Sequence, residues 1–261
     1  MPALLHTRRG ILAGAAVLAV CAPALRATAD GTPARRYLTV VARKDGLSHE
    51  DFAAQWLAQG SAAKALPNFF SGLVMSEVIG EKLPANLDAS IPSAPVDGVL
   101  EVWSPNDAAR KTTLSAAKDW AAATDALASK ATTFVTRQHV FIPPPRGTIK
   151  QFALLVRKDG LTHAEFVDHW LTIHGPMALT VPGLKGFVLS EIVGTIPGDE
   201  AVYPGIDGIA EVWWEASTDG RGQMNFSDQM KTWGADGSTF ISRNKSRTPV
   251  LQEHVFIAPV I

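Results

Sequence analysis

The sequence predicts an α+β fold made of two βαββαβ units in tandem, at residues 36–143 and 149–259. Two observations predict this fold. A set of segments recurs in the same order about 110 residues later in the chain, and each copy alternates between strand-like and helix-like periodicity. The stretch 143–147 is interpreted as the linker, because three successive prolines cannot continue a strand.

The recurrence covers four segments in each unit and never changes order. Because the order is kept and the spacing drifts by only a few residues, we interpret the pattern as a tandem duplication. The matched pairs are Arg43–His49 with Arg157–His163, Gly72–Gly80 with Gly186–Gly194, Asp97–Trp103 with Asp207–Trp213, and Gln138–Ile142 with Glu253–Ile257.

The first 29 residues are typical of a twin-arginine signal peptide. Thr7–Leu12 contains the paired arginines, an uncharged apolar run follows from Gly10 to Leu25, and Ala27–Ala29 offers a cleavage site. The run of about 15 residues is shorter than the roughly 20 that a membrane-spanning helix needs. We therefore expect export to the periplasm or beyond, with the mature chain starting near Asp30; lipidation at Cys21 is left open.

Charge and cysteine content exclude several classes of function for the mature chain. The leader removes three of 24 basic residues and none of the 25 acidic ones, so 21 basic residues remain and the net charge is -4. No basic block remains, which disfavours a nucleic-acid partner. The single cysteine also leaves, so neither a disulfide nor a thiolate nucleophile is available.

Capping motifs place the first helix of each unit. Ser48 and Asp51 form one capping pattern, and Thr162 and Glu165 form the other. Each is followed by an aromatic pair four residues apart, which gives the helix a buried stripe. The aromatic pairs are Phe52 with Trp56 and Phe166 with Trp170.

The remaining segments complete the two units. A four-stranded sheet backed by two helices leaves one face bare, whereas two such sheets placed face to face cover each other. The expected first strands are Tyr37–Arg43 and Gln151–Arg157, the second helices are Ala108–Lys130 and roughly Gln223–Gly234, and the last strands are His139–Ile142 and His254–Ile257.

A motif in the second unit resembles the EthD family of the dimeric α/β-barrel superfamily. The matching residues are Lys158, Gly160, Leu161, Thr162, Phe166, His169, Trp170, His174, Gly175, Pro176, Pro182, Gly183 and Leu184. The resemblance extends over both units but is weaker in the first. It implies ferredoxin-like units that form an α/β barrel, here within one chain, in a family of small and mostly cofactor-free proteins linked to ether degradation and polyketide-type ring chemistry. It does not imply one reaction.

His174 is the first candidate catalytic residue. It shares one helical face with Phe166 and Trp170, and Gly175-Pro176 is expected to end the helix directly after it. An imidazole at this place could act as a general acid or base near neutral pH. The alternative is a structural histidine bonded to a carbonyl of the last turn. In the first unit Gly60 stands at its place, which favours a role confined to the second unit.

Two strand carboxylates, Glu191 and Glu211, are the other catalytic candidates. Each shares strand parity with apolar residues, and a carboxylate on an apolar face must be paired or hydrogen-bonded. Glu77 and Glu101 hold the equivalent places in the first unit, which favours a structural role for all four. The functional alternative makes Glu191 or Glu211 the partner that orients the catalytic histidine.

A set of mostly aromatic residues could line an apolar pocket for an aromatic or alicyclic ligand. Core packing is the alternative role for most of its members. The substrate-binding candidates are His169, Trp170, Phe187, Tyr203, Trp213 and His254.

No cofactor is expected. The stretch 205–208 is one residue short of the peroxidase-type G-x-x-D-G pattern, so heme is kept only as an alternative. On a regular helix His169 and His174 would lie about 140° apart, so they could not share a metal ion without a break in the helix.

The sequence thus predicts an exported, cofactor-independent enzyme with one active unit, 149–259. It would act on a small aromatic or cyclic carbonyl or hydroxyl compound by histidine acid–base chemistry, in a lyase, isomerase or cyclase step. The alternatives are a periplasmic small-molecule binding protein and a heme-dependent oxidoreductase. The expected partner is the small molecule alone, without nucleic acid or membrane, and a homodimer is left open.

Overall fold

A computed structural model of the protein describes most of the two units. The residues described are 35–66, 70–81, 96–104, 118–120, 122–124, 126–195, 203, 205–215 and 227–259. The signal-peptide prediction, with Cys21, lies outside these residues. Within them, no helix is long and apolar enough to cross a membrane.

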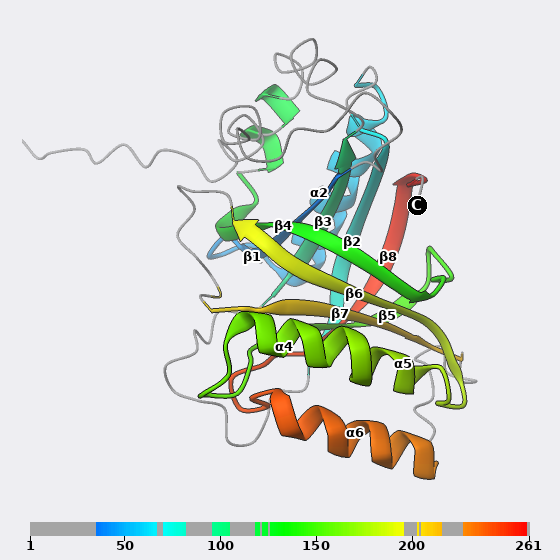
Figure 1. The fold of residues 1–261 in the computed structure, drawn as a ribbon. Helices are drawn as coiled ribbons and strands as arrows, with labels where there is room; N and C mark the ends of the chain where they lie inside the picture. The colour runs from blue at the N-terminus through cyan, green and yellow to red at the C-terminus, as the bar shows by residue number, and fades with distance from the viewer. Residues whose placement is uncertain are drawn as a thin grey trace, which may run out of the picture.

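The described strands close into an antiparallel barrel in the order β1-β3-β2-β8-β5-β7-β6-β4 (Figure 1). The order within each unit is the same: β4-β1-β3-β2 in the first and β8-β5-β7-β6 in the second. This confirms the predicted fold class. The strands are β1 Arg35–Arg43, β2 Gly72–Glu81, β3 Gly98–Ser104, β4 Ala128–Ile142, β5 Ile149–Leu155, β6 Leu184–Thr195, β7 Gly208–Trp214 and β8 Pro249–Ile257.

Two seams join the units into the barrel, one where β4 pairs with β6 and one where β2 pairs with β8. The sequence placed the last strands too late, because β4 begins at Ala128 and β8 at Pro249. The first part of β4 pairs with β1 and its second part with β6, so it must be long enough to serve both units. The expectation that Ala128–Lys130 is helical was therefore wrong.

Helices cover the outside of the barrel. The first unit has α2 (His49–Ala63), and the second has α4 (His163–His169), η1 (Trp170–His174), α5 (Gly175–Ala178) and α6 (Asp228–Phe240). Figure 1 shows α4, α5 and α6 together beside β5, β6 and β7. The described part of α6 continues six residues beyond its expected end at Gly234. The expected start of that helix, at 223–226, lies outside the described residues.

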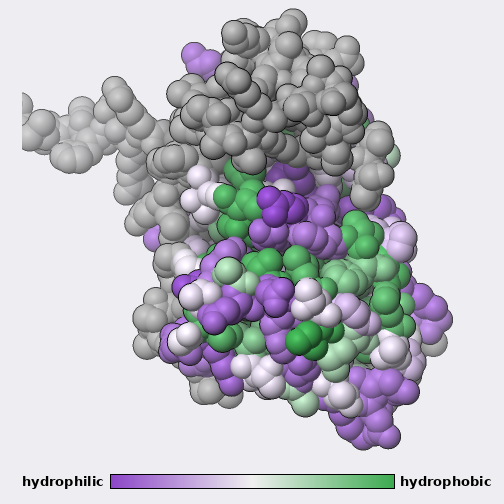
Figure 2. All heavy atoms as spheres, viewed as in Figure 1, coloured by the Kyte–Doolittle hydropathy of each residue, from purple (hydrophilic) through white to green (hydrophobic). Residues whose placement is uncertain are grey.

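The outer surface of these helices mixes hydrophilic and hydrophobic residues (Figure 2). Their exposed large hydrophobic side chains are Ile173 and Leu179. Inside this surface, buried apolar residues from the helices and from the outer face of β5, β6 and β7 form the helix–sheet core of the second unit. A separate apolar cluster fills part of the barrel interior.

Candidate functional site

The candidate site is built on one continuous helical run, α4-η1-α5. The run starts with the predicted capping box, in which the Thr162 backbone N–H donates to Glu165 Oε2 at 2.8 Å and the Glu165 N–H donates to Thr162 Oγ1 at 3.2 Å. The expectation that Gly175-Pro176 ends the helix was wrong, because α5 continues to Ala178. Pro176 follows directly after the π-turn and supplies no backbone N–H to the run.

The middle of this run, Trp170–His174, is a π-helix. The Gly175 N–H donates to the Trp170 carbonyl, which closes a turn between residues five apart. Such turns are rare, usually occur singly inside α-helices, and are frequent at functional sites. Because residues five apart lie about one turn from each other here, His169 and His174 are brought to the same side of the helix. The regular-helix argument that separated them by about 140° does not hold.

Contacts with the sheet show that the π-helix accommodates one extra residue. Trp56 lies against Gly98 and Trp170 lies against Gly208, so the two tryptophans are equivalent. Four residues after Trp56, Gly60 packs against Phe256; five residues after Trp170, Gly175 packs against Phe141. The second unit therefore has one more residue between its tryptophan and its glycine than the first.

The indole contacts of the second helices lead to the same alignment. Trp120 Nε1 donates to the Gln59 carbonyl at 2.8 Å, and Trp233 Nε1 donates to the His174 carbonyl at 3.1 Å. The counterpart of His174 is therefore Gln59. A constant offset between the two units pairs His174 with Gly60. The inserted residue shifts the match by one position, to Gln59.

His174 is buried, with only 7% of its surface exposed, and its Nδ1 lies 2.8 Å from Asp236 Oδ2. The imidazole stacks on Trp233 with centroids 5.0 Å apart, and it meets Phe240 edge-on at 5.1 Å. A side chain at Gly237 would begin 3.3 Å from His174 Cε1, so the glycine makes room for the ring. Burial lowers the pKa of His174, although the hydrogen bond and charge of Asp236 act in the opposite direction.

Asp236 also binds the second histidine. Its Oδ1 lies 3.0 Å from His169 Nε2, so one carboxylate holds both imidazoles. The side chains grow more exposed along the chain of contacts, from 9% at His174 to 15% at Asp236 and 28% at His169. With the carboxylate accepting at Nδ1, the neutral His174 ring keeps its lone pair on Nε2. That nitrogen has no hydrogen-bond partner among the residues that the structure describes.

Sequence reasoning missed Asp236. The residue lies beyond Gly234, where the sequence predicted the end of the helix, and more than sixty residues from His174 along the chain. A signal was present: Asp236 stands three residues after Trp233 and four before Phe240. On a helix this spacing puts the carboxylate on the same side as both aromatic rings.

Glu191 lies away from His174. It sits on the outer face of β6, where its carboxylate accepts from Arg137 Nη1 at 3.1 Å and lies 3.2 Å from His139 Nε2 across the β4–β6 seam. The matching pair at the other seam is His254 Nε2 with Glu77 Oε1, 3.3 Å apart. The structure therefore places Glu191 and His254 at the seams and does not bring either residue to the catalytic candidate.

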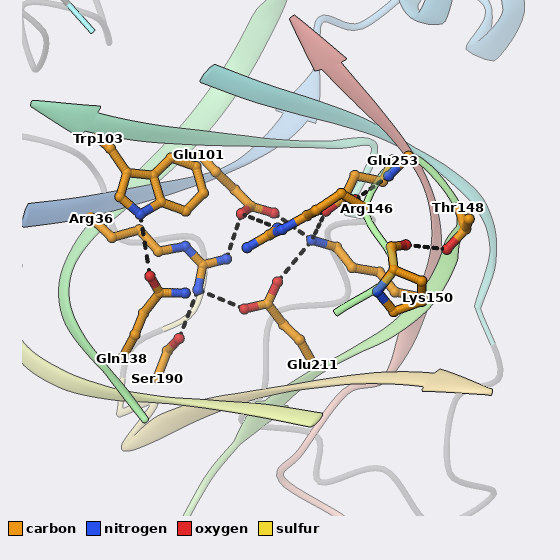
Figure 3. A network of polar contacts seen from close by, with 12 residues as sticks. Arg36, Glu101, Trp103, Gln138, Arg146, Thr148, Lys150, Ser190, Glu211 and Glu253 are labelled. Carbon is orange, nitrogen blue, oxygen red and sulfur yellow. Dashed lines mark hydrogen bonds and ion pairs between the residues drawn. The ribbon is translucent and has the colours of Figure 1, made fainter. Parts of the chain in front are cut away.

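Glu211 lies inside the barrel, on the opposite side of the sheet from His174. Arg36 Nη1 donates to Glu211 Oε2 at 2.6 Å, and Lys150 Nζ donates to Oε1 at 2.8 Å (Figure 3). Burial alone would raise the pKa of Glu211, but the two cations lower it well below its ordinary value. The partner of His174 is thus Asp236; the contacts of Glu191 and Glu211 agree with the structural role favoured for them and not with the alternative in which one of them orients the histidine.

The same buried network contains other charged side chains and one of the pocket candidates. Arg36 and Lys150 also bind Glu101, and Lys150 Nζ lies 3.2 Å from Glu253 Oε1. Trp213 faces this network, with its ring centroid 5.3 Å from Lys150 Nζ. These contacts make Trp213 part of the barrel interior and not part of the helix–sheet layer that holds His174.

Tyr203 also belongs to the barrel interior. Only 2% of its surface is exposed, it packs in the apolar interior cluster, and Arg247 Nη1 donates to its hydroxyl at 3.2 Å. Burial raises the pKa of its phenol. Trp170 and Phe187, by contrast, share the helix–sheet core with the site, and the Phe187 ring packs 5.4 Å from Trp233.

The described residues do not form a metal-binding group of three or more His, Cys, Asp or Glu side chains. Aromatic rings surround the imidazole: one side of the His174 ring stacks on Trp233, Phe240 packs edge-on, and Phe187 packs against Trp233. These contacts do not identify a heme site among the described residues, so we derive no step through heme.

The match to a known protein family lies in the unit that contains these histidines. Residues 158–244 match the EthD domain. This EthD segment includes the whole α4-η1-α5 run and Asp236. No curated protein matches the chain.

Two solved structures that match most of the chain agree on the fold. An anthrone oxidase-like protein is 12% identical with a TM-score of 0.52, and the match covers 88% of this chain and 97% of that one. A candidate monooxygenase from Lactobacillus acidophilus is 9% identical with a TM-score of 0.51, covering 88% and 99%. An EthD family protein from Bacillus halodurans is 22% identical over 41% of this chain and 94% of its own, with a TM-score of 0.29.

Proposed function

We propose that the second unit, which contains the EthD segment, is the active half of a cofactor-independent enzyme in which His174 moves a proton. The observation that supports this proposal is the His174–Asp236 pair: the carboxylate holds Nδ1, and Nε2 is left for a substrate. A general base is recognised by such a partner and by a pKa suited to its task. The first unit, with Gln59 at the equivalent place, acts as scaffold.

The electrostatics suit a base that works near neutral pH. Burial keeps His174 neutral in the resting state by lowering its pKa. When Nε2 takes a proton from the substrate, the imidazolium is stabilised by the adjacent Asp236 carboxylate. The same proton can then return to another atom of the substrate, which completes an isomerase, lyase or cyclase step without an external oxidant or reductant.

The side chains around the pair favour a small apolar substrate. Trp233 and Phe240 pack against the imidazole, and Phe187 packs against Trp233. Such a wall binds flat, apolar compounds and offers few polar contacts. We therefore propose an aromatic or cyclic carbonyl or hydroxyl compound, with acidic C–H or O–H bonds for the base to act on.

His169 serves as the positioning residue for this base. Its Nε2 lies 3.0 Å from Asp236 Oδ1, and His174 Nδ1 contacts Oδ2. Each imidazole therefore holds one of the two carboxylate oxygens. The His169 ring is itself supported by Phe240, with centroids 4.5 Å apart. A carboxylate held at both oxygens cannot rotate freely, and this keeps Oδ2 directed at the Nδ1 of His174.

Two measurements test the proposal. A UV–visible spectrum and metal analysis of protein purified from the exported fraction should show neither a Soret band nor stoichiometric metal, and either signal would overturn the cofactor-independent reaction. A panel of aromatic and cyclic ketones and phenols is then screened for turnover. Conversion should be lost in His174→Asn and kept in His163→Asn, a control on the same helical run whose partner is Asp207. Binding without any conversion would identify a binding protein instead.

We also propose export by the twin-arginine route. The support is the leader sequence alone, with its paired arginines at Arg8-Arg9. Cell fractionation tests it. Replacement of both arginines by lysine should retain the protein in the cytoplasm, and unchanged export would contradict the proposal.

A further inference from the structure

The indole N–H of Trp170 is a buried donor that the described part of the fold does not satisfy. The side chain is fully buried, and Nε1 has no hydrogen-bond partner among the described residues. Buried donors are almost always paired, because a lost partner leaves the desolvation of the polar group uncompensated. Trp170 therefore needs an explanation that its packing does not give.

The equivalent tryptophan of the first unit is satisfied. Trp56 is equally buried, and its Nε1 donates to the Ser76 carbonyl at 3.2 Å. Both tryptophans follow a phenylalanine at the same spacing and lie against a glycine of the neighbouring strand. The difference therefore does not come from the sequence pattern or from the sheet.

The two indoles are turned differently against their glycines. A Cβ built on Gly98 would meet Trp56 at Cε2 and Nε1, at 3.0 and 3.1 Å. A Cβ built on Gly208 would meet Trp170 at Cζ3 and Cη2, at 2.3 and 2.5 Å. Trp56 thus turns its pyrrole edge to the strand, while Trp170 turns its benzene edge to the strand and its N–H away from it.

The orphaned donor stands on the same short helical segment as the proposed base. Trp170 is the first residue of the π-helix and His174 is the last, so their backbone positions are about one turn apart. Both are buried in the helix–sheet layer of the second unit. One supplies a hydrogen-bond donor and the other an acceptor, and neither atom has a partner among the described residues.

We propose that Trp170 Nε1 donates a hydrogen bond to an oxygen atom of the substrate while His174 Nε2 exchanges its proton. This inference rests on the proposed function and makes it more specific. The substrate must present an acceptor oxygen, as a ketone, enol or phenol does, about one helical turn from the proton that is removed. A hydrocarbon of the same shape lacks the oxygen and leaves the indole unsatisfied.

The first test compares the stability of Trp170→Phe with that of Trp56→Phe. Both changes remove similar ring volume from a fully buried site, but only Trp56→Phe removes a hydrogen bond formed in the free protein. We expect Trp56→Phe to lower the Tm about 2–4 °C more than Trp170→Phe, as loss of one ordinary hydrogen bond predicts. An equal or larger loss in Trp170→Phe would show that this N–H is already bonded, by water or protein, and would overturn the inference.

The second test uses 1-tetralone and tetralin, a pair that differs in one carbonyl oxygen. Neutral His174 offers no proton at Nε2, so a preference for the ketone reports a separate donor. By calorimetry, wild-type protein should bind 1-tetralone about 3–10 times more tightly than tetralin. The ratio should fall to about one in Trp170→Phe and persist in Trp56→Phe. Equal binding of the two compounds by wild-type protein, or an unchanged ratio in Trp170→Phe, would contradict the inference.

The inference and the proposed function can fail separately. If His174→Asn abolishes turnover while Trp170→Phe keeps the wild-type ratio of the two affinities, the base is correct and the donor is not. If the ratio collapses in Trp170→Phe but His174→Asn retains full turnover, the donor stands and the proposed base is wrong.

Discussion

Asp236 lies 2.8 Å from the Nδ1 of His174 and, through its other oxygen, 3.0 Å from the Nε2 of His169. The two histidines can share one carboxylate because the π-helix between them adds a residue to the turn. The first unit has the same helix without the extra residue. The pair is therefore a local change in an otherwise repeated scaffold.

Asp236→Asn tests the partner of the base. The amide keeps the shape of the carboxylate but loses its charge, and it can present an N–H where His174 needs an acceptor. We expect a fall in kcat of about 10²–10⁴-fold, the range of general acid–base catalysis. Asp228→Asn is the control, because Asp228 stands exposed at the start of the same helix and pairs only with Lys231 among the described residues. Equal kcat values for the two variants would contradict the role of Asp236.

The pH profile follows from the neutral state of the base. Burial lowers the pKa of His174 from the ordinary value of 6.5. Since the neutral ring is the active form, kcat/KM should be level above pH 6.5 and should fall as the pH drops through the lowered pKa. In Asp236→Asn the supporting charge is lost, so the inflection should move to still lower pH. Activity that rises as the pH drops through the inflection would mean that the imidazole works in its charged form, and an inflection above pH 6.5 would contradict the lowered pKa.

Deletion of Ile173 tests the π-helix directly. The exposed side chain contributes little packing, and α2 shows that the fold accepts the shorter spacing. We expect an intact far-UV circular dichroism spectrum and a regular helix in which His169 and His174, then four residues apart, still lie on one side and share Asp236, so turnover should persist. Ile173→Ala keeps the length and should also keep the activity. Loss of turnover in the deletion variant alone would show that the π-turn itself is needed and would contradict this account of the pair.

The two strand glutamates should differ in their effect on stability. Glu211→Gln leaves Arg36 and Lys150 partly uncompensated inside the barrel, and breaking a buried pair of this kind costs about 3–5 kcal/mol. Glu191→Gln breaks a contact with the exposed Arg137, which is worth less than about 1 kcal/mol. Urea unfolding measures both. Similar losses would contradict the assignment of Glu211 to the barrel interior.

The sequence revealed those features whose signals are local. The capping pair Thr162 and Glu165 and the spacing of Phe166 and Trp170 placed the first helix correctly, since each contact lies within one or two turns. The recurring segments likewise predicted four strands in each unit and their sequence along the chain. These predictions agree with the structure because propensity, capping and periodicity all favour the same element.

The missed features depend on contacts between distant segments. One inserted residue between Trp170 and His174 leaves no trace in composition, and the constant spacing of the flanking repeats concealed it. The predicted helix ended at Gly234, although the helix continues past Gly237, where the His174 ring packs. Glu191 and Glu211 were both placed on an apolar face, but in a closed barrel both faces of a strand are buried. Parity alone could not separate the interior from the helix side.

Hydrogen–deuterium exchange at a carbon acid tests the central claim, that His174 moves a proton. The protein is incubated with 1-tetralone in D₂O, and deuterium uptake next to the carbonyl is followed by NMR. The account predicts catalysed uptake by wild-type protein and by His163→Asn, and uptake at the uncatalysed rate with His174→Asn. Equal uptake by wild type and His174→Asn would contradict the account, because the base would then play no part in proton transfer.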